Sequence, residues 1–71
     1  MKELTWDSHE DIALALNRRF PDVDPLSVRF TDLRRWVCEL EDFVGDPKAC
    51  TEAKLERIQM AWKEEWEEAE G

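Results

Sequence analysis

The stretch TDLRRWVCELEDFV, residues 31–44, decides the fold class of this chain. Its apolar residues recur at the i, i+3, i+4, i+7 and i+11 spacing of one helix face: Leu33, Trp36, Val37, Leu40 and Val44. Thr31 is a good N-cap, and Asp32 lies favourably near the positive end of the helix dipole. Gly45-Asp46-Pro47 then ends the pattern. We therefore predict an amphipathic helix within residues 31–44.

A helix is also predicted upstream, from the N-cap segment Asp7-Ser8 to Pro21. Acidic residues follow these caps at the spacing of a capping box. One face repeats an apolar residue every four positions, at Ile12, Leu16 and Phe20. Pro21 ends the helix because its ring disfavours helical geometry at the preceding residue. Leu14 points away from the apolar face, either as a scattered surface residue or as part of a contact patch.

A third helix is predicted downstream, beginning after the N-cap Thr51. Cys50 and Leu55 have the spacing of a hydrophobic staple around this start. The residues expected on its buried face are Leu55, Ile58, Trp62, Trp66 and Ala69. Acidic residues crowd its far end, where the helix dipole is also negative. We therefore expect residues 67–71 to form an acidic, frayed tail.

The segment between the first two helices is short and rich in turn residues. Asp22 and Asp24 are expected to be turn and cap residues, because Pro25 and a missing glycine exclude a calcium-binding EF-hand loop. Val28-Arg29-Phe30 alternates like a strand, and makes one rung of pairing or simply lies extended. The 71 residues thus predict one mainly α domain of three helices, in outline like a helix-turn-helix or winged-helix core.

The charge of the chain is strongly negative and unevenly distributed. The formal net charge is −8, and residues 1–38 hold seven acidic and six basic side chains, which leaves −1. Residues 39–71 hold eleven acidic and four basic side chains, which leaves −7. Such a field repels phosphate backbones and anionic membranes, and it attracts cations and basic protein surfaces. We expect neither a nucleic acid nor a membrane as partner.

The location of the protein is predicted from what the sequence lacks. The first residues contain no apolar run of signal-peptide length, and no stretch approaches the roughly 20 apolar residues that span a bilayer. We expect a cytoplasmic protein in which Cys38 and Cys50 are reduced.

No catalytic motif is present in the sequence. The one histidine, His9, lies near the start of a predicted helix, where a lone histidine is usually a surface residue. Only two glycines occur, so there is no glycine-rich phosphate loop. Cys38, Cys50 and His9 match no zinc-site spacing. We predict that the protein is not an enzyme and holds no tightly bound cofactor.

Carboxylates are the remaining candidates for chemistry. Two groups stand out: Asp7, Glu10 and Asp11 at the start of the first helix, and Glu39, Glu41, Asp42 and Asp46 around the end of the second. Spacings of three and four residues place carboxylates on one helix face. Hard cations such as magnesium, calcium or ferrous iron take such oxygen ligands. Three interpretations stay open: a solvated face, a weak metal site and a protein-docking surface.

Arginines form the opposite pattern. Five of the six lie between residues 18 and 35: Arg18, Arg19, Arg29, Arg34 and Arg35. They either pair locally with neighbouring aspartates or form a basic patch that makes the molecule two-faced. A winged-helix protein that binds nucleic acid would need such a patch on its recognition helix. Acidic residues follow Arg34 and Arg35 on the same predicted helix, which argues against that function.

Four segments carry a family resemblance: Leu4-Thr5-Trp6, Phe20-Pro21-Asp22-Val23-Asp24-Pro25, Val28-Arg29-Phe30-Thr31-Asp32-Leu33 and Trp36-Val37-Cys38-Glu39-Leu40-Glu41-Asp42-Phe43. Asp46-Pro47 and the helix through Trp62 continue the match. Together they resemble the IscX family of bacterial iron–sulfur cluster assembly proteins over nearly the whole chain. The sequence departs from the family pattern in a thinned acidic run, Val44-Gly45-Asp46, and in an extended tail with Trp66.

The resemblance implies a modified winged-helix fold that does not bind DNA. It also implies an adaptor or regulator that binds a cysteine desulfurase of the IscS type and binds ferrous iron weakly through acidic residues. In that family the acidic face is expected to dock on a basic region of the desulfurase, in competition with frataxin and ferredoxin.

Our leading hypothesis is therefore an acidic adaptor of cluster assembly, in a monomeric chain of mainly α, modified winged-helix-like fold with at most a very short strand pairing. The candidate ligands for weakly bound Fe²⁺ are Asp7, Glu10, Asp11, Glu39, Glu41, Asp42 and Asp46. The candidate partner-binding residues are Asp7, Glu10, Asp11, Glu39, Glu41, Asp42, Arg34 and Arg35. The alternatives are an iron chaperone or donor for cluster assembly, and a winged-helix nucleic-acid-binding protein.

Overall fold

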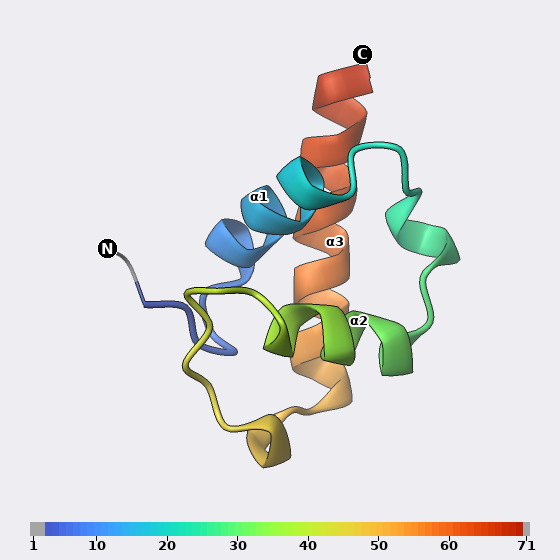
Figure 1. The fold of residues 1–71 in the computed structure, drawn as a ribbon. Coiled ribbons are helices and arrows are strands. Elements are labelled where there is room, and N and C mark those ends of the chain that lie inside the picture. Colours follow the sequence, from blue (N-terminus) through green and yellow to red (C-terminus); the bar gives the residue numbers. More distant parts are fainter. Residues whose placement is uncertain (1–2, 71) are drawn as a thin grey trace.

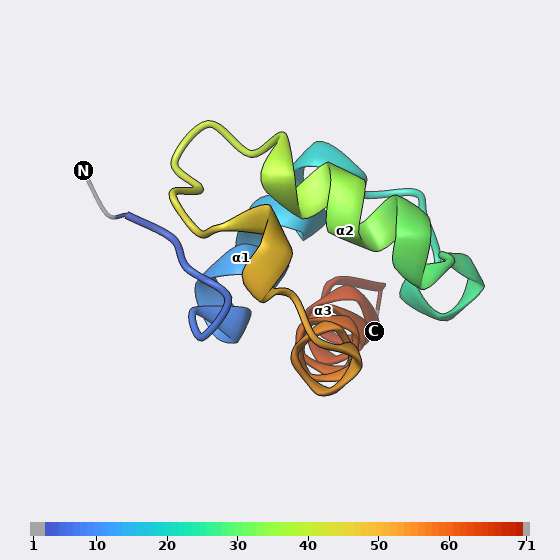
Figure 2. The ribbon, with the colours of Figure 1, turned by 90° about the horizontal axis from the view of Figure 1, so that it is seen from below.

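The computed structural model describes the backbone of residues 3–70 and the side chains of residues 3–68. It contains α1 (His9–Arg19), α2 (Phe30–Cys38) and α3 (Glu52–Glu70), with short 3₁₀ turns at Pro25–Ser27 (η1) and Pro47–Ala49 (η2). α3 is the longest element, and α1 and α2 cross it at different heights (Figure 1). Viewed along α3, both shorter helices lie on the same side of it (Figure 2). The predicted mainly α, three-helix fold is confirmed.

The core lies where the three helices meet. α3 contributes the apolar series Leu55, Ile58 and Trp62, and the last two are fully buried. The other residues of the core are Leu4, Trp6, Ile12, Ala13, Leu16, Val28, Leu33, Val37 and Leu40. Most of these positions follow the helical spacing read from the sequence. Trp66 is half-buried against the same core, whereas the side chain of Ala69 lies outside the described residues.

Aromatic rings join the ends of α1 and α2 to α3. The ring of Phe20, directly after α1, stacks on the indole of Trp36 in α2, with 4.4 Å between centroids. Trp36 in turn meets Trp62 of α3 edge-on at 6.4 Å. Pairs of this geometry add stability beyond the area that they bury. They fix the side of α2 that turns toward the core.

α1 and α3 begin close to their predicted starts. α1 has Glu10 and Asp11 in its first turn and Arg18 and Arg19 in its last, as the helix dipole favours. The Ser8 hydroxyl, however, makes no cap hydrogen bond to α1; it accepts from the Thr5 amide at 3.2 Å. At α3 the Thr51 hydroxyl does act as a cap, since it accepts from the Lys54 amide at 3.3 Å.

The prediction for the second helix was wrong at both ends. α2 begins at Phe30, so Thr31 lies inside the helix, and it ends at Cys38 rather than near Val44. The amide of Leu40 donates to the Val37 carbonyl, which tightens the chain into a turn. Val44 is 57% exposed, and Phe43 packs against the core instead. The apolar spacing continues past the end of α2 because Leu40, which lies in the turn after the helix, is still buried in the core.

Of the two alternatives predicted for residues 28–30, the extended one holds for Val28 and Arg29, and the short strand pairing lies elsewhere. Val28 and Arg29 are extended and Phe30 starts α2. The described residues contain one isolated parallel bridge, between Leu4 and Phe43. The Leu4 amide donates to the Asp42 carbonyl at 2.9 Å, and the Val44 amide donates to the Leu4 carbonyl at 2.8 Å. Thus the start of the chain is tied to the loop after α2.

We predict that Trp6→Phe lowers the free energy of unfolding by about 1–3 kcal/mol. Trp6 is 4% exposed, and its indole N–H donates to the Asp46 carbonyl, a bond that Phe cannot make. Urea denaturation followed by circular dichroism measures the effect. Leu26→Ala is the control, since Leu26 is 55% exposed and should change stability by less than about 0.5 kcal/mol. Equal unfolding midpoints for Trp6→Phe and the wild type would contradict the assigned role.

Candidate functional site

The bridge between Leu4 and Phe43 joins the two segments of the chain that carry the acidic groups. After this bridge, the segment that contains Leu4 continues to Asp7 and α1, and the segment that contains Phe43 continues to Asp46 and η2. The N-terminal segment and the loop after α2 lie together at one side of the molecule (Figures 1 and 2). We call the combined surface the acidic face, defined by Asp7, Glu10, Asp11, Glu39, Glu41, Asp42 and Asp46.

Trp6 fixes the alignment of the two segments. Its indole Nε1–H donates to the Asp46 carbonyl at 2.6 Å. Its ring meets Phe43 edge-on, with centroids 4.8 Å apart. The Phe43 ring lies over Gly45 so closely that a Cβ there would come within 2.6 Å of Cζ. Gly45 therefore serves close packing, and the loop that carries the second acidic group is held by an aromatic contact and a hydrogen bond.

Most carboxylates of the acidic face are solvent-exposed, and Asp11 is half-buried. Asp7 and Asp46 are among those that have structural partners. Asp7 accepts an ion-paired hydrogen bond from Lys54 of α3 at 3.2 Å. Asp46 accepts from the Lys48 amide at 2.9 Å and so caps η2, as Asp24 caps η1 through the Leu26 amide. The acidic face thus retains exposed charge at Glu10, Glu39, Glu41 and Asp42.

The acidic face does not assemble a compact metal site. Within residues 3–68, no three histidine, cysteine, aspartate or glutamate side chains lie close enough to hold one ion. Tight binding of a hard cation requires several converging oxygen ligands. Weak binding of ferrous iron by these carboxylates stays a prediction.

The arginines of the second helix are engaged within the fold. Arg34 donates to the Pro47 carbonyl through Nε at 3.3 Å and through Nη2 at 3.1 Å, which attaches η2 to α2. Arg35 pairs with Asp32 at 3.4 Å on the surface. Arg19 lies 5.8 Å from the centre of the Phe20 ring. The partner-binding role predicted for Arg34 and Arg35 stays a prediction. The pair of hydrogen bonds from Arg34 to the Pro47 carbonyl, which we call the Arg34 clamp, was not predicted, because it joins residues thirteen apart in sequence.

We expect Arg34→Gln to lower the free energy of unfolding by about 1 kcal/mol, because the Pro47 carbonyl loses both donors. The neighbouring Arg35→Gln is the matched control, since it removes only an exposed ion pair with a value below about 0.5 kcal/mol. Hydrogen exchange should also accelerate at residues 47–50 in Arg34→Gln alone. Identical stability and exchange in the two variants would refute the clamp.

Cys38 and Cys50 are free, half-buried thiols that lie on either side of the loop. Burial raises the pKa of both thiols, and the nearby Arg34 guanidinium only partly opposes that rise. The thiolate is the reactive form of cysteine. Both residues are therefore protonated and poorly nucleophilic at neutral pH.

We predict that iodoacetamide alkylates both cysteines of the folded protein more slowly at pH 7 than it alkylates the urea-unfolded chain. The rates should still be rising above pH 9, because the pKa of each thiol is raised from 9.0. Mass spectrometry of quenched samples resolves the two sites. Folded-state rates that match the unfolded chain at neutral pH would show that burial does not protect the thiols.

The sequence of the chain matches a known protein family. A family model described as "Iron-sulphur cluster assembly" matches residues 4–67, which include α1, α2, most of α3 and the acidic face. The chain belongs to this family. The resemblance to the IscX proteins is thereby confirmed, and the family assignment supports a role in iron–sulfur cluster assembly.

A relative is known from Pseudomonas aeruginosa. It is an uncharacterized protein, 50% identical over 62 residues, which cover 87% of this chain and 94% of the relative. The similarity therefore extends over nearly the full length of both proteins. In the described part of this chain, no helix is both long and apolar enough to cross a bilayer.

Proposed function

We propose that the protein is a non-catalytic adaptor or regulator that binds a cysteine desulfurase of the IscS type through the acidic face. Binding there would modulate the delivery of sulfur for cluster assembly. The family assignment supports the process, and the charge and geometry of the acidic face support the mode of binding. The partner surface would be basic, so that it complements a chain of net charge −8.

The observation that carries the proposal is the bridge between Leu4 and Phe43. Without it, the acidic groups around Asp7 and around Asp42 would belong to separate segments, 35 positions apart in sequence. With it, the segment that leads to Asp7 is hydrogen-bonded to the loop that contains Asp42, and Trp6 joins the same segment to Asp46. A fixed array of like charges attracts an oppositely charged surface and aligns it during encounter.

Ferrous iron is a weak secondary ligand in this proposal. The carboxylates of the acidic face are oxygen donors suited to a hard cation, but they do not converge. Competition with frataxin and ferredoxin would follow if these proteins use the same basic surface of the desulfurase.

The docking proposal predicts a charge-dependent association rate. The triple variant Glu39→Gln, Glu41→Gln, Asp42→Asn should associate with the desulfurase about tenfold more slowly at low salt, because three steering charges are lost. The control Glu65→Gln, Glu67→Gln, Glu68→Gln removes the same charge from the far part of α3 and should have a smaller effect. Surface plasmon resonance at several salt concentrations measures both variants. A wild-type association rate that does not change with salt would count against the proposal.

The iron component has a separate test. Calorimetry with Fe²⁺ under anaerobic conditions should give a micromolar or weaker dissociation constant, because single surface carboxylates hold the ion loosely. Much tighter binding would favour the alternative function of an iron chaperone or donor. Fluorescence anisotropy with duplex DNA at low salt tests the nucleic-acid alternative, and we expect no binding.

A further inference from the structure

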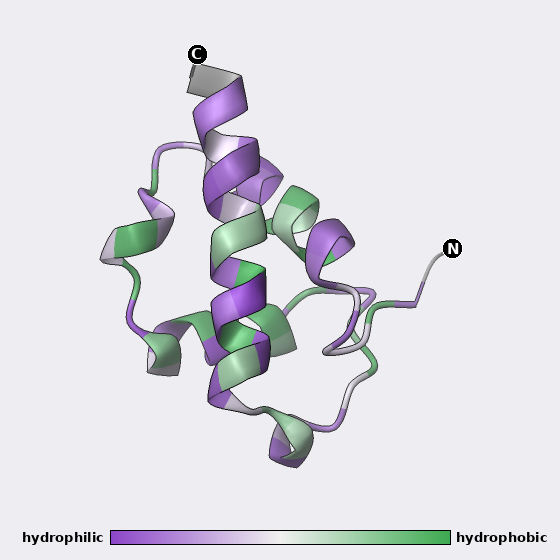
Figure 3. Ribbon diagram, turned by 180° about the vertical axis from the view of Figure 1, so that it is seen from behind, coloured by the Kyte–Doolittle hydropathy of each residue, from purple (hydrophilic) through white to green (hydrophobic). Residues whose placement is uncertain are grey.

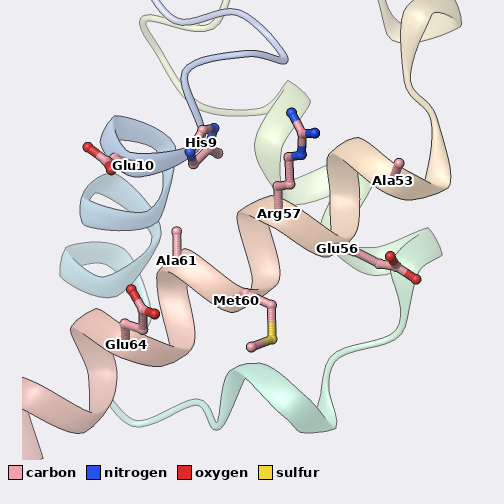
Figure 4. A pocket seen from close by; sticks show the side chains of 8 residues that line it. All are labelled: His9, Glu10, Ala53, Glu56, Arg57, Met60, Ala61 and Glu64. Carbon is pink, nitrogen blue, oxygen red and sulfur yellow. The ribbon is translucent and has the colours of Figure 1, made fainter.

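One side of α3 packs into the core, and a different side carries a second row of regularly spaced side chains. Ala53, Arg57, Met60, Ala61 and Glu64 are spaced by three or four residues and so share one side of the helix. His9 and Glu10, from the first turn of α1, lie along one edge of this row (Figure 4). Together with Glu56 these residues line a shallow, open groove of about 580 Å³ along α3, with the first turn of α1 at one edge.

The groove exists because two of its floor positions are alanine. Ala53 and Ala61 carry only methyl groups on this side of α3, and the longer side chains of Arg57 and Glu64 lie on either side of Ala61 along the helix (Figure 4). Met60 is 50% exposed, and its flexible, polarizable side chain adds to the apolar surface that Ala53 and Ala61 present in the groove. Along α3, hydrophobic and hydrophilic residues alternate in sequence, as the ribbon coloured by hydropathy shows (Figure 3).

The charged side chains of the groove are available to a ligand. Glu10, Glu56, Glu64 and Arg57 make no hydrogen bond or ion pair with any side chain in the described part of the chain. Three carboxylates and one guanidinium leave a local charge of −2 with His9 neutral. A second copy of this chain is a poor occupant, because two chains of net charge −8 repel each other. A basic partner fits.

The dimensions favour a helical occupant. From Ala53 to Glu64 the floor covers about 16 Å of helix axis, which is three turns at about 1.5 Å per residue. Grooves between two helices commonly receive an amphipathic helix through its apolar face. Such an occupant would place an apolar side chain against Met60 and Ala61, and lysine or arginine near Glu10 and Glu64.

We propose that this groove receives a basic amphipathic helix from a protein partner, with Met60 as the apolar anchor and Arg57 selecting one acidic residue in that helix. Glu10 belongs to both the groove and the acidic face, so the two surfaces are continuous. The inference extends the proposed function only where the partner is the desulfurase. The groove itself is also testable with a model peptide.

Met60 provides a selective probe, because the chain contains only two methionines, Met1 and Met60. With both labelled by ¹³C at the ε-methyl group, the full-length protein is titrated first with a synthetic three-turn helix of leucine and lysine, and with the same peptide carrying glutamate for lysine. The Met60 methyl signal should shift saturably with the basic peptide alone. Failure to shift with the basic peptide would overturn the groove as a binding site.

The same protein is then titrated with the cysteine desulfurase. Met60→Gln keeps the length and net charge of the side chain but removes its apolar end, and should weaken binding of the peptide and the desulfurase roughly fivefold to tenfold. Leu26→Gln is the matched control, since Leu26 is similarly exposed but lies on η1, outside the groove. Loss of affinity in Met60→Gln alone supports the inference, and equal losses in both variants contradict it.

Two further outcomes separate this inference from the proposed function. A desulfurase that binds the wild type but leaves the Met60 signal unchanged, and binds Met60→Gln normally, refutes the groove as its contact while the acidic face stands. A desulfurase that does not bind the wild type refutes the proposed function. In that case the peptide titration with Met60→Gln and Leu26→Gln decides the groove by itself.

Discussion

The hydrogen bond from the Trp6 indole to the Asp46 carbonyl is the interaction on which the candidate site depends. It joins the start of the chain to the loop after α2, with the Phe43 ring packed against Trp6 and over Gly45. Loss of this bond would leave one more buried indole N–H without an acceptor, which lowers stability. This contact accompanies the Leu4–Phe43 bridge, and together they tie two segments that are separate in sequence and that each carry acidic residues.

The helices were largely predictable because local rules govern them. Pro21 and the caps at Asp24 and Thr51 mark boundaries that the structure reproduces within a residue or two. The end of α2 was not predictable in this way. Leu40 keeps the helical spacing but reaches the core from a turn, so periodicity alone placed the boundary too late. The bridge between Leu4 and Phe43 is a tertiary contact for which the sequence contains no local signal.

The residues of the candidate site come from the sequence and their roles stay predictions, whereas their arrangement comes from the structure. The uneven charge and the family resemblance both indicated the carboxylates around Asp7 and Asp42. Neither could indicate that Arg34 is occupied by the Pro47 carbonyl, or that Asp46 caps η2. The groove beside Met60 was also missed, because two alanines and an exposed methionine become a surface feature only when α1 packs beside α3. Local sequence carries charge and periodicity, whereas these features depend on packing.

The central claim is that the two acidic segments act as one docking face. A double-mutant cycle on the desulfurase association rate tests it most directly, with Asp7→Asn/Glu10→Gln as one half and Glu41→Gln/Asp42→Asn as the other. The account predicts that each half slows association about threefold to tenfold at low salt, and that the combined variant is slower than either. A normal rate for either half, or a combined variant no slower than one half alone, would contradict it.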